Sequence, residues 1–350
     1  MKKKRVSLKS IAEALNTSST TVSFILNGKA EEKHISAKLT KKVLDYVAEI
    51  NYQPNQLAKS LRTGRSNILV FMVEDISNSF FSRLARVIED IAYKKGYKVI
   101  FCSNENDDNK SIELINLFSL RQVDGFIIVP SPGLSPVIKK LVNENIPVIL
   151  LDRYFENLEC NIVVINNKEA SYEATMHLIK NGYKNILFIT TDTQQTQMIA
   201  RLDGYKEALQ EYGLVPQVLF IPFKDTHTEE SKVLILNFLK NSQHKDALFF
   251  ATNYLTLKAL EAFKENAPEL TEKLGMVTFD DNDFFSVLTP TITAVSQPLW
   301  EMANQLMKLM LHLLNSKDEV LLPKKIVLDA ELLVRNSSIS VDKNEHNYND

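Results

Sequence analysis

VSLKSIAEALNTSSTTVSFIL, residues 6–26, is the stretch that decides how the amino-terminal part of this 350-residue chain folds. Ile11, Ala12 and Leu15 recur at helical spacing, and Ser7 stands where an N-cap residue is expected. Asn16 follows, a polar residue that favours turns over helix interiors. The stretch therefore predicts a short helix that ends in a turn, with a second helix after it.

The second helix is predicted to begin after Ser18, which can act as its N-cap. It has an apolar side, formed by Val22, Ile25 and Leu26. Its other side carries short, mostly hydroxyl side chains and one aromatic ring, from Ser19, Thr20, Ser23 and Phe24. Two short helices joined in this way are typical of a helix-turn-helix, whose second helix enters the DNA major groove. The alternative is a capped helical hairpin that serves only for packing.

The distribution of charge favours the DNA-binding interpretation. Residues 1–66 contain 13 Lys or Arg and 5 Asp or Glu, a net charge of +8, whereas the other 284 residues carry a net charge of −10. The overall charge of −2 therefore combines a basic head with an acidic body. A basic head is the electrostatic footprint expected of a domain that binds phosphates.

A third helix completes the headpiece, which we place at residues 1–53. Ser36 is its expected N-cap, and its apolar stripe consists of Leu39, Val43, Tyr46, Val47 and Ile50. The basic segment PNQLAKSLRTGRS, residues 54–66, begins with a proline that suits a first helical turn. A helix of this length is not stable alone, because isolated helices need about 12 residues or more. The segment is either a plain linker or a hinge helix that forms only on DNA.

From residue 67 onward, apolar strands alternate with helices, once over residues 67–163 and again over residues 164–293. This alternation predicts two α/β lobes built on parallel sheets, and ligands bind such sheets at the carboxyl ends of their strands. We expect the body to span residues 67–340. Residues 294–325 should join the first lobe and residues 326–340 the second. The polar tail, residues 341–350, is expected to be disordered.

Cysteine content and hydropathy indicate the compartment. The two cysteines, Cys102 and Cys160, form neither a metal-ligand spacing nor a disulfide framework. The basic start MKKKR is followed by amphipathic sequence rather than by the apolar run of a signal peptide. No stretch approaches the roughly 20 apolar residues that span a bilayer. We therefore expect a soluble cytoplasmic protein without a membrane partner.

Several segments taken together resemble the lactose-repressor (LacI/GalR) family of bacterial transcription regulators. They are VSLKSIAEALN and TTVSFILNG in the head, YQPNQLAKSLRTGRSN at the hinge, and VDGFIIVP, IPVILLDR, FDD and SQP in the body. The resemblance covers residues 6–338. It implies an all-α helix-turn-helix headpiece followed by an α/β effector domain of two Rossmann-like lobes, similar to a periplasmic binding protein.

The resemblance also implies which residues contact DNA. Ser19 and Thr20 should face bases, and the residues expected near phosphates are Ser7, Ser18, Thr21, Ser23 and Asn27. In the hinge, Asn55, Ala58 and Leu61 are expected at the DNA, with Leu61 as a wedge in the minor groove at the operator centre. Phe24 departs from the arginine that is frequent at its position in the family. It can pack on a thymine methyl group, or it can pack in the headpiece core.

In the body, the family pattern places a small effector between the lobes. The matching positions are Phe80, Phe81, Asp152, Arg153, Arg201, Asn253 and Asp280. Arg201 and Asp280 would bind sugar hydroxyls, and a ring such as Phe80 would cover the apolar side of a pyranose. A sugar or sugar derivative is favoured over a purine. The alternatives are a surface cation for Arg201, a turn residue for Asp280 and core packing for the two phenylalanines.

Two other classes of protein share parts of this pattern. A periplasmic-type sugar-binding receptor has the same two-lobed body, but it lacks a basic head and carries a secretory signal. An enzyme would need chemistry that the sequence does not display, since it has no phosphate-binding glycine motif, no GxSxG and no HExxH, and its six histidines are scattered. We therefore expect no catalysis, no metal and no cofactor. The sequence predicts a homodimeric, effector-controlled repressor that binds a near-palindromic, double-stranded operator.

The charge of the head generates a first prediction. If residues 1–66 bind phosphates, the affinity of the full chain for duplex DNA should fall steeply with salt, because bound counterions are released on binding. Contact with 6–10 phosphates would reduce the affinity by about 10³–10⁵-fold between 50 and 200 mM salt. Fluorescence anisotropy over a salt series measures the slope. An affinity that stays constant over this range would contradict phosphate binding by the head.

Overall fold

The computed structural model describes residues 7–52, 64–242, 244–316 and 322–339. The chain forms two compact units, residues 1–66 and 67–350. Within the described ranges, no helix is both long enough and apolar enough to cross a membrane. The predictions for Asn55, Ala58 and Leu61, and for the tail at residues 341–350, concern residues outside the described ranges.

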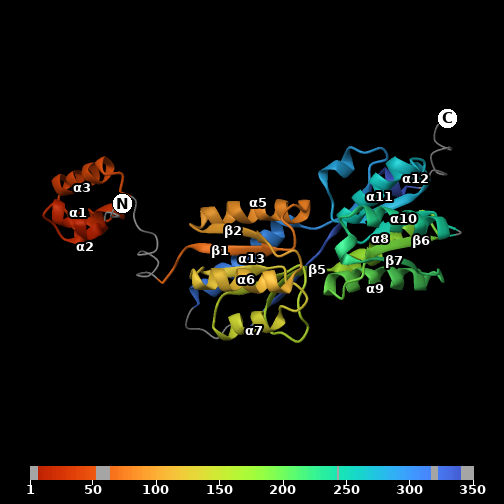
Figure 1. Cartoon of the computed structure of the whole chain (residues 1–350), viewed down its shortest axis with the longest axis horizontal. Coiled ribbons are helices and arrows are strands. Elements are labelled where there is room, and N and C mark those ends of the chain that lie inside the picture. Colours follow the sequence, from red (N-terminus) through yellow and green to blue (C-terminus); the bar gives the residue numbers. More distant parts are fainter. Residues whose placement is uncertain (1–6, 53–63, 243, 317–321, 340–350) are drawn as a thin grey trace. The chain divides into compact units, whose positions relative to one another are not determined.

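The first unit is the three-helix headpiece that the sequence predicts, formed by α1 (Leu8–Ala14), α2 (Ser19–Leu26) and α3 (Ala37–Glu49) (Figure 1). All three predicted N-caps are confirmed. The hydroxyls of Ser7, Ser18 and Ser36 each accept a hydrogen bond from a backbone N–H three residues later, at 3.0–3.3 Å. The small shared core is formed by Ile11, Ala12, Leu15, Val22, Ile25 and Val43. The helix-turn-helix is therefore present, with its second helix as α2.

The second unit contains two six-stranded sheets. The first sheet has the order β11-β5-β4-β3-β1-β2 and is parallel throughout. Its strands are β1 (Ile68–Val73), β2 (Lys98–Ser103), β3 (Gly125–Ile128), β4 (Val148–Leu151), β5 (Asn161–Ile165) and β11 (Lys325–Leu328). Its helices are α5 (Ser79–Lys94), α6 (Asp108–Leu120), α7 (Ser135–Asn143) and α13 (Leu299–Asn315).

Both faces of this sheet are covered, with α5 on one side and α6 and α7 on the other (Figure 1). Alternate residues of β1 pack against the helices on opposite faces of the sheet. Leu69 and Phe71 pack in the core that includes residues of α5 and α13, whereas Val70 and Met72 pack in the core that includes residues of α6 and α7. A strand buried on both faces is apolar without alternation, which is the pattern that the sequence displays.

The second sheet repeats this plan in the order β12-β10-β9-β8-β6-β7, with only β12 antiparallel to its neighbour. Its strands are β6 (Ile186–Thr191), β7 (Gln217–Ile221), β8 (Ala247–Phe250), β9 (Gly275–Phe279), β10 (Thr293–Ser296) and β12 (Glu331–Leu333). One face packs with α8 (Asn167–Lys180) and α9 (Thr196–Glu211), the other with α10 (Glu229–Asn241) and α11 (Asn253–Asn266) (Figure 1). A short helix, α12 (Leu270–Lys273), precedes β9.

The chain crosses between the lobes at positions that differ slightly from the predicted ones. Residues 164 and 165 belong to the first lobe, because β5 pairs with β4 and β11. Residues 294–296 belong to the second lobe in β10, and residues 326–328 to the first lobe in β11. Asn166 connects two of the crossings: its side chain donates to Asp329 Oδ1 at 3.0 Å and accepts from the Ala330 N–H at 2.9 Å. Strand pairing, which hydropathy does not report, therefore sets the boundaries.

Helices α8 and α9 approach each other closely at Gly204. A Cβ atom at this position would lie 2.1 Å from the carbonyl oxygen of Lys168 and 2.8 Å from the backbone nitrogen of Tyr172. One turn earlier on α9, the carbonyl oxygen of Arg201 accepts a hydrogen bond from Ser171 Oγ at 2.5 Å. The absent side chain of Gly204 thus allows α8 to hold the part of α9 that carries Arg201.

A stability prediction follows from this contact. Gly204→Ala should destabilise the body, because overpacking costs about 1–3 kcal/mol while the gain in helix propensity is at most about 1 kcal/mol. Urea unfolding followed by circular dichroism measures the difference. Gln210→Ala, on the exposed face of the same helix, is the matched control and should stay within about 0.5 kcal/mol of the parent. Equal stability of Gly204→Ala and the parent would show that the helices can separate without cost.

Candidate functional site

Two aspartates occupy equivalent positions at the carboxyl ends of the two sheets. Asp152 directly follows β4 and Asp280 directly follows β9, and both have left-handed backbone with φ of 68°. The N–H of Asp152 donates to the Val163 carbonyl at 3.2 Å, and the N–H of Asp280 to the Val295 carbonyl at 3.0 Å. Both side chains are buried. Each lobe therefore presents one carboxyl group where ligands bind parallel sheets.

Arg201 lies beside Asp280 in the second lobe and is only 2% exposed, so the alternative that it is a surface cation is wrong. Its Nε donates to Asn167 Oδ1 at 2.8 Å, and its Nη1 donates to the Ala251 carbonyl at 2.7 Å. Nη1 also lies 3.5 Å from Asp280 Oδ2. The guanidinium stacks over Phe279, 3.8 Å from the ring centroid. Four partners thus hold one buried cation in a single orientation.

Arg153 is a second buried cation, contributed by the first lobe. Its Nη2 donates to the carboxylate of Glu74, and its Nη1 donates to Asn106 Oδ1 at 3.3 Å. Its Nε lies 3.7 Å from Asp152 Oδ2. Sequence reasoning did not identify Glu74, although its place directly after the buried strand β1 was a usable signal.

Electrostatic interactions connect the charged groups around Arg153 in the first lobe with those around Arg201 in the second. Burial raises the pKa of Asp152 to about 6, and the guanidinium groups of Arg153 and Arg201 offset part of that rise. The charges of Asp280 and Glu74 raise it further. The pKa of this first-lobe carboxyl therefore depends on charged side chains of both lobes. The structure thus brings four of the predicted effector residues into one cluster: Asp152, Arg153, Arg201 and Asp280.

Direct hydrogen bonds also join the rims of the two lobes. Asn253, at the start of α11, donates to Ser79 Oγ at 3.2 Å, and Asn282 donates to the same oxygen at 2.7 Å. On another part of the rim, Gln195 Nε2 donates to Asn106 Oδ1 at 2.9 Å. Asn253, a predicted effector residue, thus bonds across the cleft at the rim.

The predicted phenylalanines are both buried, and their ring centroids lie 5.0 Å apart in an edge-to-face arrangement. Both belong to the core that includes residues of β1 and α5, as the packing alternative expects. Phe80 also lines a cavity of about 220 Å³ together with Asp280 and Gln297. Of the two rings, the structure therefore brings Phe80 next to the polar cluster and packs Phe81 in the core.

Three further residues at the cleft were missed in the sequence. Gln297, in the SQP segment, donates to Asp280 Oδ1 at 2.5 Å. Tyr254 lies near Glu74, whose charge adds to the effect of burial in raising the pKa of the phenol. Gln195 comes from the amino end of α9. Among the described residues, the buried atoms without a hydrogen-bond partner include Arg153 Nε, Gln197 Oε1 and Gln297 Oε1.

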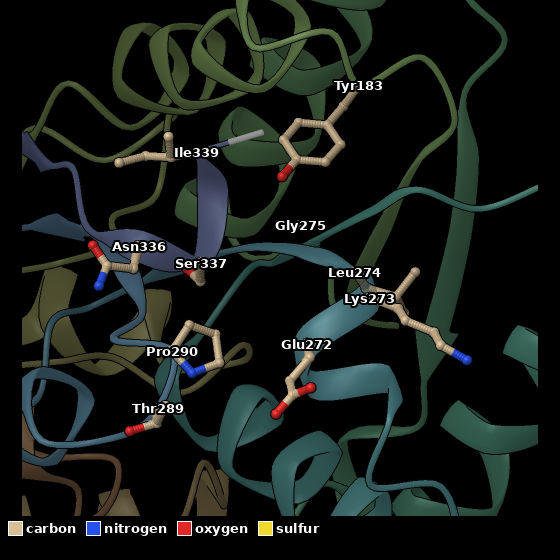
Figure 2. Close-up of a pocket in the computed structure, with 10 residues that line it drawn as sticks. All are labelled: Tyr183, Glu272, Lys273, Leu274, Gly275, Thr289, Pro290, Asn336, Ser337 and Ile339. Carbon is tan, nitrogen blue, oxygen red and sulfur yellow. The ribbon is translucent and has the colours of Figure 1, made fainter. Parts of the chain in front are cut away.

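A larger cavity, of about 410 Å³, lies elsewhere in the second lobe (Figure 2). It is lined by Gly275, where β9 begins, by Tyr183, which precedes β6, and by Ser337. Figure 2 shows that the side chain of Lys273 extends away from the other lining residues. The cavity is therefore at the amino ends of the strands, opposite to the buried charges, and it does not belong to the polar cleft.

In the headpiece, the outer face of α2 is accessible. Ser18, Ser19, Thr20 and Asn27 are exposed, and Ser7, the N-cap of α1, is exposed as well. Ser18 Oγ lies 2.8 Å from Thr21 Oγ1, and the Asn27 amide donates to the Ser23 carbonyl at 2.7 Å. Phe24 is half-buried on this face. All eight predicted DNA contacts that lie within the described residues therefore lie on α2 or at the ends of α1 and α2.

Comparisons with known proteins agree with both halves of this description. Residues 7–55 match the family of bacterial regulatory proteins of the lacI type, and residues 69–318 match a periplasmic binding protein domain. The chain is 31% identical over 337 residues to the HTH-type transcriptional regulator RegA of Clostridium saccharobutylicum. This alignment covers 95% of the present chain and 99% of RegA.

Solved structures show the same architecture. A LacI-family transcriptional regulator from Enterococcus faecium with bound ribose is 26% identical, with a TM-score of 0.69, and the match covers 77% of this chain and 98% of that one. The lac repressor dimer bound to operator and an anti-inducer matches at a TM-score of 0.79, over 96% of this chain and 100% of that one. At 19% identity the second match supports the fold alone. Taken with the helix-turn-helix headpiece and the two-lobed body, these matches show that the chain belongs to the lacI family of bacterial regulatory proteins and is a DNA-binding regulator of transcription.

Proposed function

We propose that this regulator is a homodimeric cytoplasmic repressor whose affinity for its operator is set by an uncharged sugar bound between the lobes. The observation that carries the proposal is the pair of buried guanidinium groups at the carboxyl ends of the two sheets, each paired with a carboxylate. The bound sugar would contact Asp152, Arg153, Arg201 and Asp280, with Asn253 and Phe80 at the margins.

The charges of the cluster favour a neutral ligand. Arg201 pairs with Asp280, whereas Arg153 is shared by two acids, Glu74 and Asp152, so three acids face two cations. A phosphate or carboxylate would therefore meet no surplus positive charge, and three acids would repel it. Sugar hydroxyls suit the cluster, because they donate to carboxylates and accept from guanidinium groups.

The unpartnered atoms and the aromatic rings also favour a sugar. The buried oxygens Gln197 Oε1 and Gln297 Oε1 can each accept a hydrogen bond from a hydroxyl, and Arg153 Nε can donate one to a hydroxyl oxygen. Phe279 cannot stack on a purine, because the Arg201 guanidinium covers it at 3.8 Å. The ribose bound to the Enterococcus faecium regulator is the same class of ligand.

Exposed apolar side chains near the sheet edges support a dimer. β2 and β7 are edge strands of the first and second sheet. Leu120, at the end of α6, is 85% exposed, and Val215, which precedes β7 by two residues, is 75% exposed. Tyr93 and Phe220 are also exposed in these regions. A two-fold interface would cover such surfaces and give the complex two headpieces for two half-sites of a near-palindromic operator.

The sugar would act by favouring one arrangement of the lobes, since a ligand shifts an equilibrium only by its differential affinity for the two states. The rim bonds of Ser79 with Asn253 and Asn282 exist when the lobes are in contact. A ligand that bridges Asp152 and Asp280 adds to these bonds. The headpiece spacing would then respond through the segments that connect the lobes.

A ligand screen tests the proposal. Neutral pentoses and hexoses should raise the melting temperature of the full chain, whereas their phosphates should not, because the cleft has no surplus cation. Asp280→Asn should weaken binding of the active sugar about five- to 150-fold, the equivalent of roughly 1–3 kcal/mol for a lost charged acceptor. Asp283→Ala is the matched control, because Asp283 is an exposed acid of the same loop. Sugar affinity should survive in this control.

Operator binding by the pocket variants, measured with and without sugar, is the second part of the test. The Asp280→Asn and Arg201→Lys variants should bind operator like the parent in the absence of sugar and should no longer respond to it. If both variants keep the parental sugar affinity and response, the proposed pocket residues are wrong. If phosphorylated sugars bind and neutral ones do not, the proposed ligand class is wrong.

The raised pKa of Asp152 generates a pH prediction. In the free protein this carboxyl is half-protonated near pH 6, and hydroxyl donors of a sugar would favour its ionised form. Sugar affinity should therefore rise by up to about tenfold between pH 5 and pH 7 and then level off, because binding displaces the proton from the fraction of Asp152 that is protonated, about half of the molecules at pH 6. Calorimetry at pH 6 in buffers of different ionisation enthalpy measures the release. Asp152→Asn should abolish it, and a variant that still releases the proton would assign it to another group.

A further inference from the structure

Phe24 occupies an unusual position on α2. It lies one turn after Thr20 and next to Ser23 on the outer side of the helix, whereas Val22 and Ile25 on the inner side are buried. The ring is half-buried, yet within the described headpiece Phe24 is not one of the residues that pack on the core. The interpretation of Phe24 as a core residue therefore has no support in the structure, and the ring has an open surface on the DNA-facing side.

The loop after α2 positions this ring. The carbonyl oxygen of Phe24 accepts a hydrogen bond from the Lys29 N–H at 2.9 Å, which anchors the start of the loop on the helix. The ammonium of Lys33, further along the loop, lies 5.6 Å from the ring centroid, within the range of a cation–π contact. The half-buried ring thus stands among hydroxyls and lysines on the outer side of α2, a setting that suits a surface that meets the major groove.

We infer that Phe24 contacts the methyl group of a thymine in each operator half-site and thereby sets the base preference at that position. This inference rests on the proposed binding of an operator. Phenylalanine has no donor or acceptor, so it cannot pair with the O6 and N7 acceptors of guanine, and covering those atoms with a ring would leave them unsatisfied. The C5-methyl group of thymine is the apolar group that standard bases offer in the major groove.

The expected effect of this contact is modest and measurable. Burying one methyl-sized group is worth about 0.8 kcal/mol, which corresponds to about a fourfold change in affinity. Loss of the contact in both half-sites of a symmetric operator would multiply the two factors to about 15-fold, provided that the two positions are independent.

Uracil substitution isolates the methyl group, because uracil differs from thymine only by its absence. A duplex is first selected from a random library with the full chain, without and with a mixture of neutral sugars. Each thymine of the selected duplex is then replaced singly by uracil, and anisotropy titrations measure the affinity. The parent should lose about fourfold at one thymine per half-site, and 5-methylcytosine at that position should bind better than cytosine.

Substitutions at position 24 connect this effect to the ring. Phe24→Ala should bind the thymine and uracil duplexes equally, and Phe24→Leu should keep part of the difference. Phe24→Arg should shift the selected base to guanine, because arginine donates two hydrogen bonds to its edge. Thr20→Ala is the matched control on the same face, and it should alter the preference at a different base pair while keeping the uracil effect.

The outcomes separate this inference from the proposed function. If a specific duplex is selected but no uracil substitution weakens binding, or if Phe24→Ala retains the uracil effect, the role of Phe24 is refuted and the operator-binding proposal stands. If no specific duplex emerges under either condition, the operator-binding proposal itself fails. A uracil effect that disappears only in Phe24→Ala supports both.

Discussion

The buried guanidinium of Arg201 is the interaction on which the proposed effector cleft depends. Its partners come from α8 through Asn167, from the end of β8 through Ala251 and from the end of β9 through Phe279 and Asp280. Because an uncompensated buried charge costs several kcal/mol, these elements must stay in register around it. The close approach of α8 and α9 at Gly204 serves the same end, since it determines where α9 presents the cation.

The same cluster is connected by a direct bond to the chain segments that join the lobes. Asp280 accepts a hydrogen bond from Gln297, which lies between β10 of the second lobe and α13 of the first. A ligand that competes for this carboxylate would replace the hydrogen bond from Gln297 and would thereby act directly on a segment that joins the lobes. The proposed coupling between effector and lobe arrangement would therefore pass through one hydrogen bond, in addition to the rim contacts at Ser79.

The sequence allowed the fold to be predicted from local patterns, whereas the residues of the proposed cleft were predicted from the resemblance to the family. Buried strands are apolar runs, and residues such as Asp152 and Asp280 directly follow such runs. Glu74 occupies the same kind of position after β1, but nothing in the sequence shows that Arg153 will pair with it. Local patterns also did not reveal the crossing points near Asn166, and they left open whether Phe81 packs in the core, because these features depend on which strands pair and on which side a helix lies.

The opposite net charges of the head and the body determine which part of the chain attracts DNA. A net charge of −10 outside residues 1–66 repels the DNA backbone, so the phosphates attract the head and not the lobes. Affinity for DNA is thereby confined to a small unit whose core is formed by six buried side chains. An effector bound within the body cannot change that affinity by touching DNA. It could change that affinity only through the relative placement of two headpieces, and for this reason the proposed control of DNA binding by a sugar would require both the proposed dimer and the segment that connects head and body.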